Sequence, residues 1–239
     1  MFDHVTIRAS DPAASQRFYE LVLATIGVPR AEDNRFSAWG AYEFFVLGDG
    51  GVTRRLHIAF GAPSRDHVDE FWRVGTGAGY RDDGAPGLRP QYGDDYYGGF
   101  LLDPDGNSAE AVHHGGMRRD GCIDHMWFRV ADVEVSTRFY ETIAPHAGLS
   151  VRRVDDARTQ LIGESGSFSV VRGEPTQSVH VAFPATENAT VDEFHRTALA
   201  AGYADNGAPG ERPYHPGYYG AFVLDPDGNN IEVVNHNTG

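Results

Sequence analysis

Residues 225–232 read DPDGNNIE, and residues 103–110 read the closely similar DPDGNSAE, 122 positions earlier. The Pro and Gly of each run are typical of a tight turn. The residues that follow each turn read as a short strand, which contains Glu110 in the first copy and Glu232 in the second. One turn-and-strand unit therefore occurs twice in the chain.

Other segments repeat at offsets of 121 to 123 residues. They are Asp3-His4 and Asp124-His125, RFYE at 17–20 and at 138–141, HIAF at 57–60 and HVAF at 180–183, and GAPG at 84–87 and at 207–210. A period of this length indicates a duplicated domain rather than a solenoid. We expect two homologous domains, 1–115 and 122–239, joined by a linker at 116–121.

The composition excludes several classes of function. With 239 residues, 41% hydrophobic residues and a formal net charge of −14, the chain reads as an acidic globular protein. The negative charge argues against nucleic acid and anionic membranes as partners. All 20 basic residues are Arg, which excludes chemistry that depends on a lysine. The chain has a single cysteine and shows no cationic, apolar leader, so we expect a cytoplasmic protein. We expect it to be a monomer or a homodimer.

Each half divides again into two modules of the order strand, helix, three strands. Asp11 offers a helix N-cap with Pro12 at the first helical position, and Thr190 and Glu193 stand at the spacing of a capping box. The repeated order predicts an α+β protein in which helices pack on one face of antiparallel-rich sheets.

Strand alternation brings three ligand-type residues to one face in each half. In the strand expected at 3–9 the apolar Val5 and Ile7 face the helix, which leaves His4 on the other face. The same reasoning applies to the other strands and gives two sets, His4, His57 and Glu110 in the first half, and His125, His180 and Glu232 in the second.

Two imidazoles and a carboxylate suit Fe(II), Mn(II), Zn(II) or Ni(II) and leave positions open for a substrate. The sequence leaves the composition of each site open. Sequential pairing of modules joins the three residues of each half. Crossed pairing joins His4 with His180 and Glu232, and His125 with His57 and Glu110.

The module order, the His of the opening strand, the HIAF and HVAF segments and the DPDGNxxE runs together resemble the vicinal oxygen chelate superfamily. This superfamily includes glyoxalase I, bleomycin-resistance proteins and extradiol dioxygenases. The resemblance implies four βαβββ modules, paired into two open, incompletely closed barrels with helices on the outer face. It also implies a divalent metal that chelates adjacent oxygens of a small substrate.

Departures from the family patterns bear on the reaction. A fourth ligand of the glyoxalase I type could come from Glu43, but Ser167 stands at the matching place in the second half. His215 is placed like the loop His of extradiol dioxygenases, while Phe222 replaces their usual Tyr. Lyase, isomerase and dioxygenase chemistry therefore all stay open. The alternative is metal-independent drug sequestration like that of bleomycin-resistance proteins, which the many tyrosines favour.

The filled triads favour a metal-dependent enzyme. For catalysis we expect His215, because an imidazole exchanges protons near neutral pH, and Tyr219 beside it. For binding of an oxygen-rich substrate we expect four arginines and one tyrosine near the sites. These are Arg8, Arg129, Arg89, Arg212 and Tyr97.

Overall fold

A computed structural model describes residues 1–31 and 37–237 of the chain. Its contacts divide the chain into two compact units. Unit 1 contains Met1–Val5 and Phe128–Gly239, and unit 2 contains Thr6–Trp127. The chain passes from one unit to the other inside β1 (His4–Arg8) and inside β8 (Ile123–Val130). The first residues of each repeat therefore belong to the unit formed by the rest of the other repeat.

The strands belong to two mixed sheets, of seven and eight strands, and neither sheet closes into a barrel. The expected α+β class is confirmed, since strands and four helices alternate along the described residues. No helix in the described part of the chain has the length and apolar character needed to cross a membrane.

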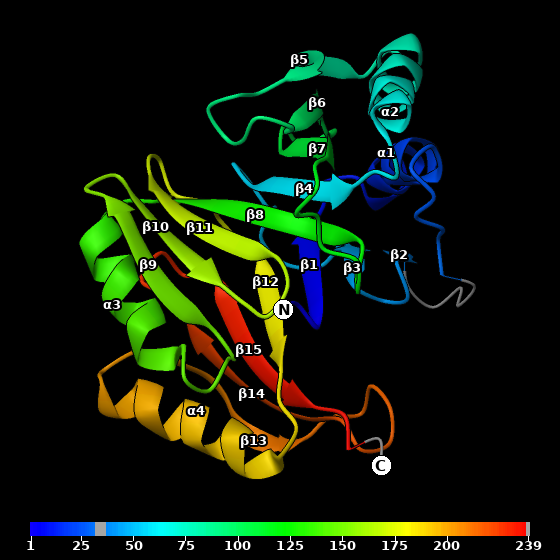
Figure 1. Ribbon diagram of the computed structural model, residues 1–239. Helices are drawn as coiled ribbons and strands as arrows, with labels where there is room; N and C mark the ends of the chain where they lie inside the picture. Colours follow the sequence, from blue (N-terminus) through cyan, green and yellow to red (C-terminus); the bar gives the residue numbers. More distant parts are fainter. Residues whose placement is uncertain (32–36, 238–239) are drawn as a thin grey trace. The chain divides into compact units, whose positions relative to one another are not determined.

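Unit 2 contains the strand order β5-β6-β7-β4 followed by the start of β8, and the end of β1 followed by β3 and β2. Its helices α1 and α2 pack against each other, and α2 also covers β6 (Figure 1). The elements are α1 (Pro12–Ala24), β2 (Ser37–Trp39), β3 (Phe44–Leu47), β4 (His57–Gly61), α2 (Arg65–Gly77), β5 (Arg81–Leu88), β6 (Tyr97–Leu102) and β7 (Ser108–His113).

Unit 1 repeats this plan with β13-β14-β15-β12 followed by the start of β1, and with the end of β8 followed by β11, β10 and β9. Its helices α3 and α4 lie side by side against the strands (Figure 1). The elements are α3 (Val133–Ile143), β9 (Ser150–Asp155), β10 (Arg158–Ile162), β11 (Ser167–Arg172), β12 (His180–Pro184), α4 (Asn188–Ala200), β13 (Asp205–Glu211), β14 (Tyr219–Leu224) and β15 (Asn230–Asn235).

Local capping signals in the sequence predict the start of one helix correctly and the start of another wrongly. Asp11 caps α1 by accepting a hydrogen bond from the backbone N–H of Ala14, and Pro12 is the first helical residue, as the sequence predicts. The capping-box prediction for the last helix is wrong. Helix α4 begins three residues earlier, after Glu187, so Thr190 already lies inside it and Glu193 pairs with Arg196 instead.

The DPDGN turns act as buried anchors. In unit 1, the carboxylate of Asp225 accepts hydrogen bonds from the backbone N–H groups of Asp227 and Asn229 and from the Asn229 side chain, at 2.8 to 3.0 Å. The Asn229 side chain also donates to the carbonyl of Thr176 at 3.1 Å. The turn therefore ties the start of β15 to the chain before β12. Burial outweighs these hydrogen bonds and raises the pKa of Asp225 to about 6.

This pKa makes the stability of unit 1 depend on pH. A carboxyl group with a raised pKa in the folded protein stabilises the fold while it is protonated, and this contribution is lost as the pH rises through about 6. The shift from 3.8 to about 6 corresponds to about 3 kcal/mol, of which about 2 kcal/mol should be lost between pH 4.5 and 7. Urea unfolding followed by circular dichroism should show this loss in the native protein relative to Asp225→Asn. A constant difference between the two proteins across this pH range would refute it.

Candidate metal centres

In unit 1, the side chains of His4, His180 and Glu232 converge from β1, β12 and β15. The Nε2 atoms of the two imidazoles are 3.0 Å apart. The Oε2 atom of Glu232 lies 3.0 Å from Nε2 of His180 and 3.6 Å from Nε2 of His4. The carboxylate is buried, whereas 14% of the His4 side chain is exposed. We call these three residues the unit 1 centre.

In unit 2, His57, Glu110 and His125 converge from β4, β7 and β8 in the same way. The Oε2 atom of Glu110 lies 3.0 Å from Nε2 of His57 and 3.5 Å from Nε2 of His125. The strand register explains the arrangement, because the small residue Ala59 faces Glu110 on β7 and His125 on β8. We call these three residues the unit 2 centre. Of the two pairings that the sequence left open, the structure shows the crossed one.

The tyrosine directly before β6 or β14 fixes the carboxylate of each centre. The hydroxyl of Tyr218 donates to Oε1 of Glu232 at 2.7 Å, and that of Tyr96 donates to Oε1 of Glu110 at 2.8 Å. These bonds leave Oε2 of each carboxylate directed at the imidazoles. Burial, followed by the neighbouring carboxylate, raises the pKa of both tyrosines, so they stay protonated donors.

Sequence reasoning chose the neighbouring tyrosines instead. The hydroxyls of Tyr97 and Tyr219 donate at 2.7 Å to Asp69 on α2 and Asp192 on α4, away from the carboxylates of the centres. The alternation of side chains along the strand indicates the correct tyrosine. Phe100 pairs directly with Glu110, and the residue four positions before it, on the same face, is Tyr96.

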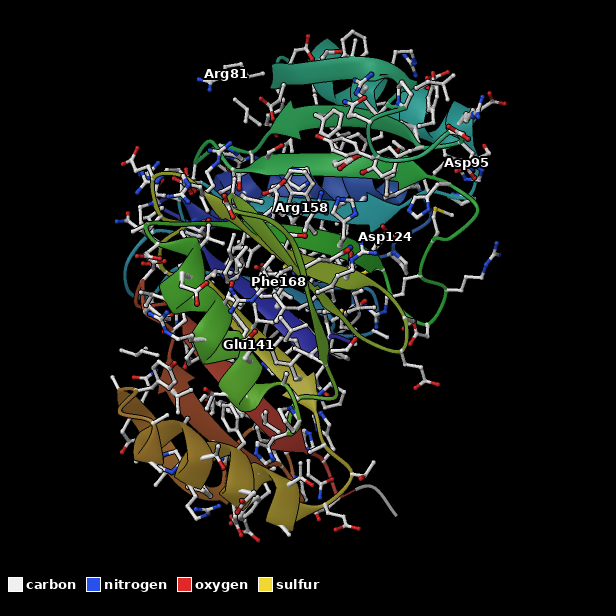
Figure 2. All side chains as sticks on the ribbon, turned by 60° about the vertical axis from the view of Figure 1, so that its left-hand side comes forward. Arg81, Asp95, Asp124, Glu141, Arg158 and Phe168 are labelled. Atoms are coloured by element: carbon white, nitrogen blue, oxygen red, sulfur yellow. The ribbon has the colours of Figure 1, made fainter. Side chains whose placement is uncertain are left out.

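Each opening-strand imidazole is oriented by the aspartate that precedes it. Nδ1 of His4 lies 2.8 Å from Asp3, and Nδ1 of His125 lies 2.9 Å from Asp124, which is labelled in Figure 2. Burial would raise the pKa of Asp124, but hydrogen bonds from His114 and His125 hold it well below its usual range. With Nδ1–H bonded to a carboxylate, Nε2 carries the free electron pair, as metal-ligating histidines require.

The remaining ring nitrogens of the middle histidines contact different partners. Nδ1 of His57 lies 3.2 Å from the hydroxyl of Ser108, and Nδ1 of His180 lies 2.5 Å from the side-chain amide of Asn230. In each case the partner begins the strand that pairs in parallel with the strand of the histidine. The same parallel pair therefore positions the histidine and the glutamate.

The unit 1 centre has the features of a metal site. Among the described residues, Oε2 of Glu232 is a buried oxygen without a hydrogen bond, since the nearby His180 nitrogen lies at contact distance but outside hydrogen-bond geometry. Burial raises the pKa of Glu232 to about 7. Ligands about 2.1 Å from one first-row metal lie about 3.0 to 3.4 Å from each other. Two of the three separations between the ligand atoms, both 3.0 Å, fall in this range, and the third, 3.6 Å between Glu232 and His4, lies just above it.

His215 is exposed and belongs to a chain of hydrogen-bonded groups in unit 1. Its Nε2 lies 2.8 Å from Nδ1 of His236, whose Nε2 lies 2.8 Å from Asp3, and Asp3 holds His4. In unit 2 the equivalent chain begins at His114, which lies 3.2 Å from Asp124, because Gly93 occupies the place of His215.

The arginines expected to bind substrate have other contacts. Arg89 and Arg212 donate to backbone carbonyls of the strands that precede them, β5 and β13, and lie over the rings of Phe100 and Phe222. Of the two, Arg212 also lowers the pKa of Glu232 electrostatically.

Arg8 and Arg129 cover glycines of neighbouring loops. An added Cβ at Gly50 would lie 3.0 Å from Nε of Arg8, and one at Gly173 would lie 3.2 Å from Cδ of Arg129. The side chains of Arg8 and Arg129 therefore pack against the loops that contain Gly50 and Gly173.

Glu43 is not available as a fourth ligand. It is buried in an ion pair with Arg118 and also accepts a hydrogen bond from the backbone N–H of Cys122. Arg118 lies in the expected linker 116–121, and its own backbone N–H donates to Asp124 at 3.0 Å. This segment therefore contacts the residue that orients His125.

Comparison with known proteins supports the interpretation of the fold. The model of the Glyoxalase/Bleomycin resistance protein/Dioxygenase superfamily matches residues 122–233, and no curated protein matches the chain. Glyoxalase I from Zea mays has a similar structure, with a TM-score of 0.69 and 17% identity over 98% of this chain and 92% of that one. The structure of a putative dioxygenase from Bacillus subtilis subsp. subtilis str. 168 is also similar, with a TM-score of 0.68 and 13% identity over 100% of this chain and 86% of that one. The second half of the chain therefore resembles this superfamily by sequence, and the whole chain shares its fold with these two structures.

Proposed function

We propose that this protein is an enzyme that holds one divalent metal ion in each unit and acts on a small molecule with two adjacent oxygen atoms. The observation that carries the proposal is the buried Oε2 of Glu232, which has no hydrogen bond and faces two imidazole nitrogens. A buried carboxylate oxygen without a partner is costly unless a cation occupies the site.

The ligands of the proposed ions are His4, His180 and Glu232 in unit 1, and His57, Glu110 and His125 in unit 2. This donor set suits Fe(II), Mn(II), Zn(II) or Ni(II). A bound ion would supply Lewis-acid polarisation of the substrate oxygens. The names of the two structural neighbours suggest either glyoxalase-type or dioxygenase-type chemistry, and the ion pair of Glu43 leaves each centre with three protein ligands.

The surrounding residues prepare each centre for its ion. Asp3 and Asp124 hold the Nδ1 protons of His4 and His125, which directs the Nε2 electron pairs inward. Tyr218 supplies the hydrogen bond that keeps the second oxygen of Glu232 in place. We also propose that Arg212, which already lowers the pKa of Glu232, orients an anionic or oxygen-rich substrate at the unit 1 centre.

Metal titration tests the proposal. Apo protein titrated with Fe(II), Mn(II), Zn(II) or Ni(II) in turn should bind two equivalents of at least one of them per chain, because each unit contains one complete ligand set. A variant with Glu110 and Glu232 both changed to Ala should bind neither equivalent at the same concentrations. If the native protein binds none of the four metals, the metal-independent sequestration alternative takes the place of this proposal.

We propose that His215 carries protons for the unit 1 centre. Both of its nitrogens face acceptors, His236 and the carbonyl of Pro216, each at 2.8 Å, so the ring accommodates a second proton. His215→Gly introduces the residue that unit 2 has, and it should lower turnover at the unit 1 centre by about 100-fold. Added imidazole should restore part of the rate. Unchanged turnover in His215→Gly, alongside a large loss in Glu232→Ala, would contradict this role.

A further inference from the structure

The two centres share a ligand set but differ in the side chains beside it. Trp127 faces His57 directly across the β4–β8 pair, and the two ring centroids are 5.8 Å apart. Because Trp127 lies two positions after His125 on β8, both side chains project from the same face of the sheet. The indole therefore stands on the face that presents the metal ligands.

Tyr92 extends this aromatic surface. Its ring packs edge-on against Trp127, with ring centroids 5.5 Å apart and an interplanar angle of 89°. It also packs against the ring of Tyr96, with centroids 5.2 Å apart. Tyr92 is 46% exposed, and 20% of the His57 side chain is exposed as well. A molecule that reaches His57 from solvent therefore meets the rings of Trp127 and Tyr92 nearby.

The sequence repeat shows that the tryptophan of this surface is specific to one centre. Asp124-His125 aligns with Asp3-His4, so the position of Trp127 corresponds to Thr6 in the other copy. The loop differs as well, since Gly93 follows Tyr92 whereas His215 follows Tyr214. Tyr214 occupies the place of Tyr92 and packs on Tyr218 with centroids 5.0 Å apart. The indole of Trp127 therefore distinguishes the unit 2 centre, and a histidine pair, His215 and His236, distinguishes the unit 1 centre.

We propose that the unit 2 centre selects a ligand whose chelating oxygens are attached to a planar aromatic group, and that Trp127 determines this selectivity. The proposal rests on the proposed function, because the oxygens need the metal to hold them. A planar ring beside Trp127 gains both apolar burial and an edge-to-face or offset-stacked contact with the indole. A ligand with a methyl group in place of the ring gains neither contact.

Benzohydroxamate and acetohydroxamate form a matched pair of probes, since they offer the same two oxygens and differ only in phenyl or methyl. The full-length Glu232→Ala variant retains only the unit 2 ligand set, and Glu110→Ala retains only the unit 1 set. After each variant is loaded with Zn(II) and its zinc content is measured, calorimetry gives the affinity for both hydroxamates. The preference for phenyl over methyl should be about tenfold greater at the unit 2 centre than at the unit 1 centre.

Substitution at Trp127 identifies the residue responsible. In the Glu232→Ala background, Trp127→Thr, which introduces the residue of the other copy, should reduce the preference to that of the unit 1 centre. Trp127→Phe should keep most of it, and circular dichroism should show both variants folded. Equal preferences at the two zinc-loaded centres, or a preference that Trp127→Thr does not change, would overturn this inference alone. A protein that takes up no zinc would overturn the proposed function and this inference with it.

Discussion

Gly98→Ala is expected to weaken metal binding at the unit 2 centre by about 100-fold while leaving the unit 1 centre intact. A Cβ atom added at Gly98 would lie closer to Oε1 of Glu110 than carbon and oxygen can approach, and only 3.3 Å from the ring of Tyr96. Glu110 and Tyr96 are both buried, so the carboxylate has little room to retreat without leaving the imidazoles. Gly220→Ala should act in the same way on Glu232 and the unit 1 centre, where the Cβ would lie 2.5 Å from Oε1.

Equilibrium dialysis of each variant against Zn(II) measures the effect. Gly77→Ala is the matched control, because Gly77 ends helix α2 at the surface and an added Cβ would meet no atom within 4 Å. Gly98→Ala and Gly220→Ala should each retain one tight equivalent, and Gly77→Ala should retain two. Two tight equivalents in Gly98→Ala would show that the carboxylate of Glu110 is not held in the position on which the metal proposal depends.

Much of each candidate centre is readable from the sequence because strand alternation is a local property. Once Val5 and Ile7 are assigned to the helix side, His4 must face the other way, and the same parity places His57 and Glu110. The structure brings the same six residues together, as two crossed sets rather than as the triad of each half. The module order likewise predicts the α+β fold, since each helix follows an opening strand.

The pairing of the modules is not a local property. Sequential and crossed pairing use the same strands with the same faces, and they differ only in whether β8 or β1 lies beside β4. In the structure β4 pairs with β8, so Ala59 faces His125. No short-range signal in the sequence distinguishes the two choices.

Side-chain partners that come from distant segments were also missed. Glu43 could be read as a metal ligand or as an edge residue, but its partner Arg118 lies 75 positions away in the expected linker. For the tyrosines the signal was present but was not used. Parity from Phe100 and Glu110 selects Tyr96 over Tyr97, because the hydrogen-bonded pair of strands fixes which face each residue takes.

The central claim is that each polypeptide contains two metal centres built by crossed pairing of its repeats. Paired substitutions separate crossed from sequential pairing, because His4 shares a centre with Glu232 in the first case and with Glu110 in the second. The two double variants, His4→Ala with Glu232→Ala and His4→Ala with Glu110→Ala, each lose one imidazole and one carboxylate. They are therefore matched in composition and differ only in which centres they damage.

The most direct measurement is the number of tightly bound Zn(II) ions per chain in these two variants, determined by metal analysis after dialysis and checked for folding by circular dichroism. Loss of even one ligand should weaken a centre by at least about 100-fold. We expect His4→Ala with Glu232→Ala to retain one ion, because His57, Glu110 and His125 stay complete, and His4→Ala with Glu110→Ala to retain none. The reverse result, with one ion retained only when His4 and Glu110 are replaced together, would contradict crossed pairing.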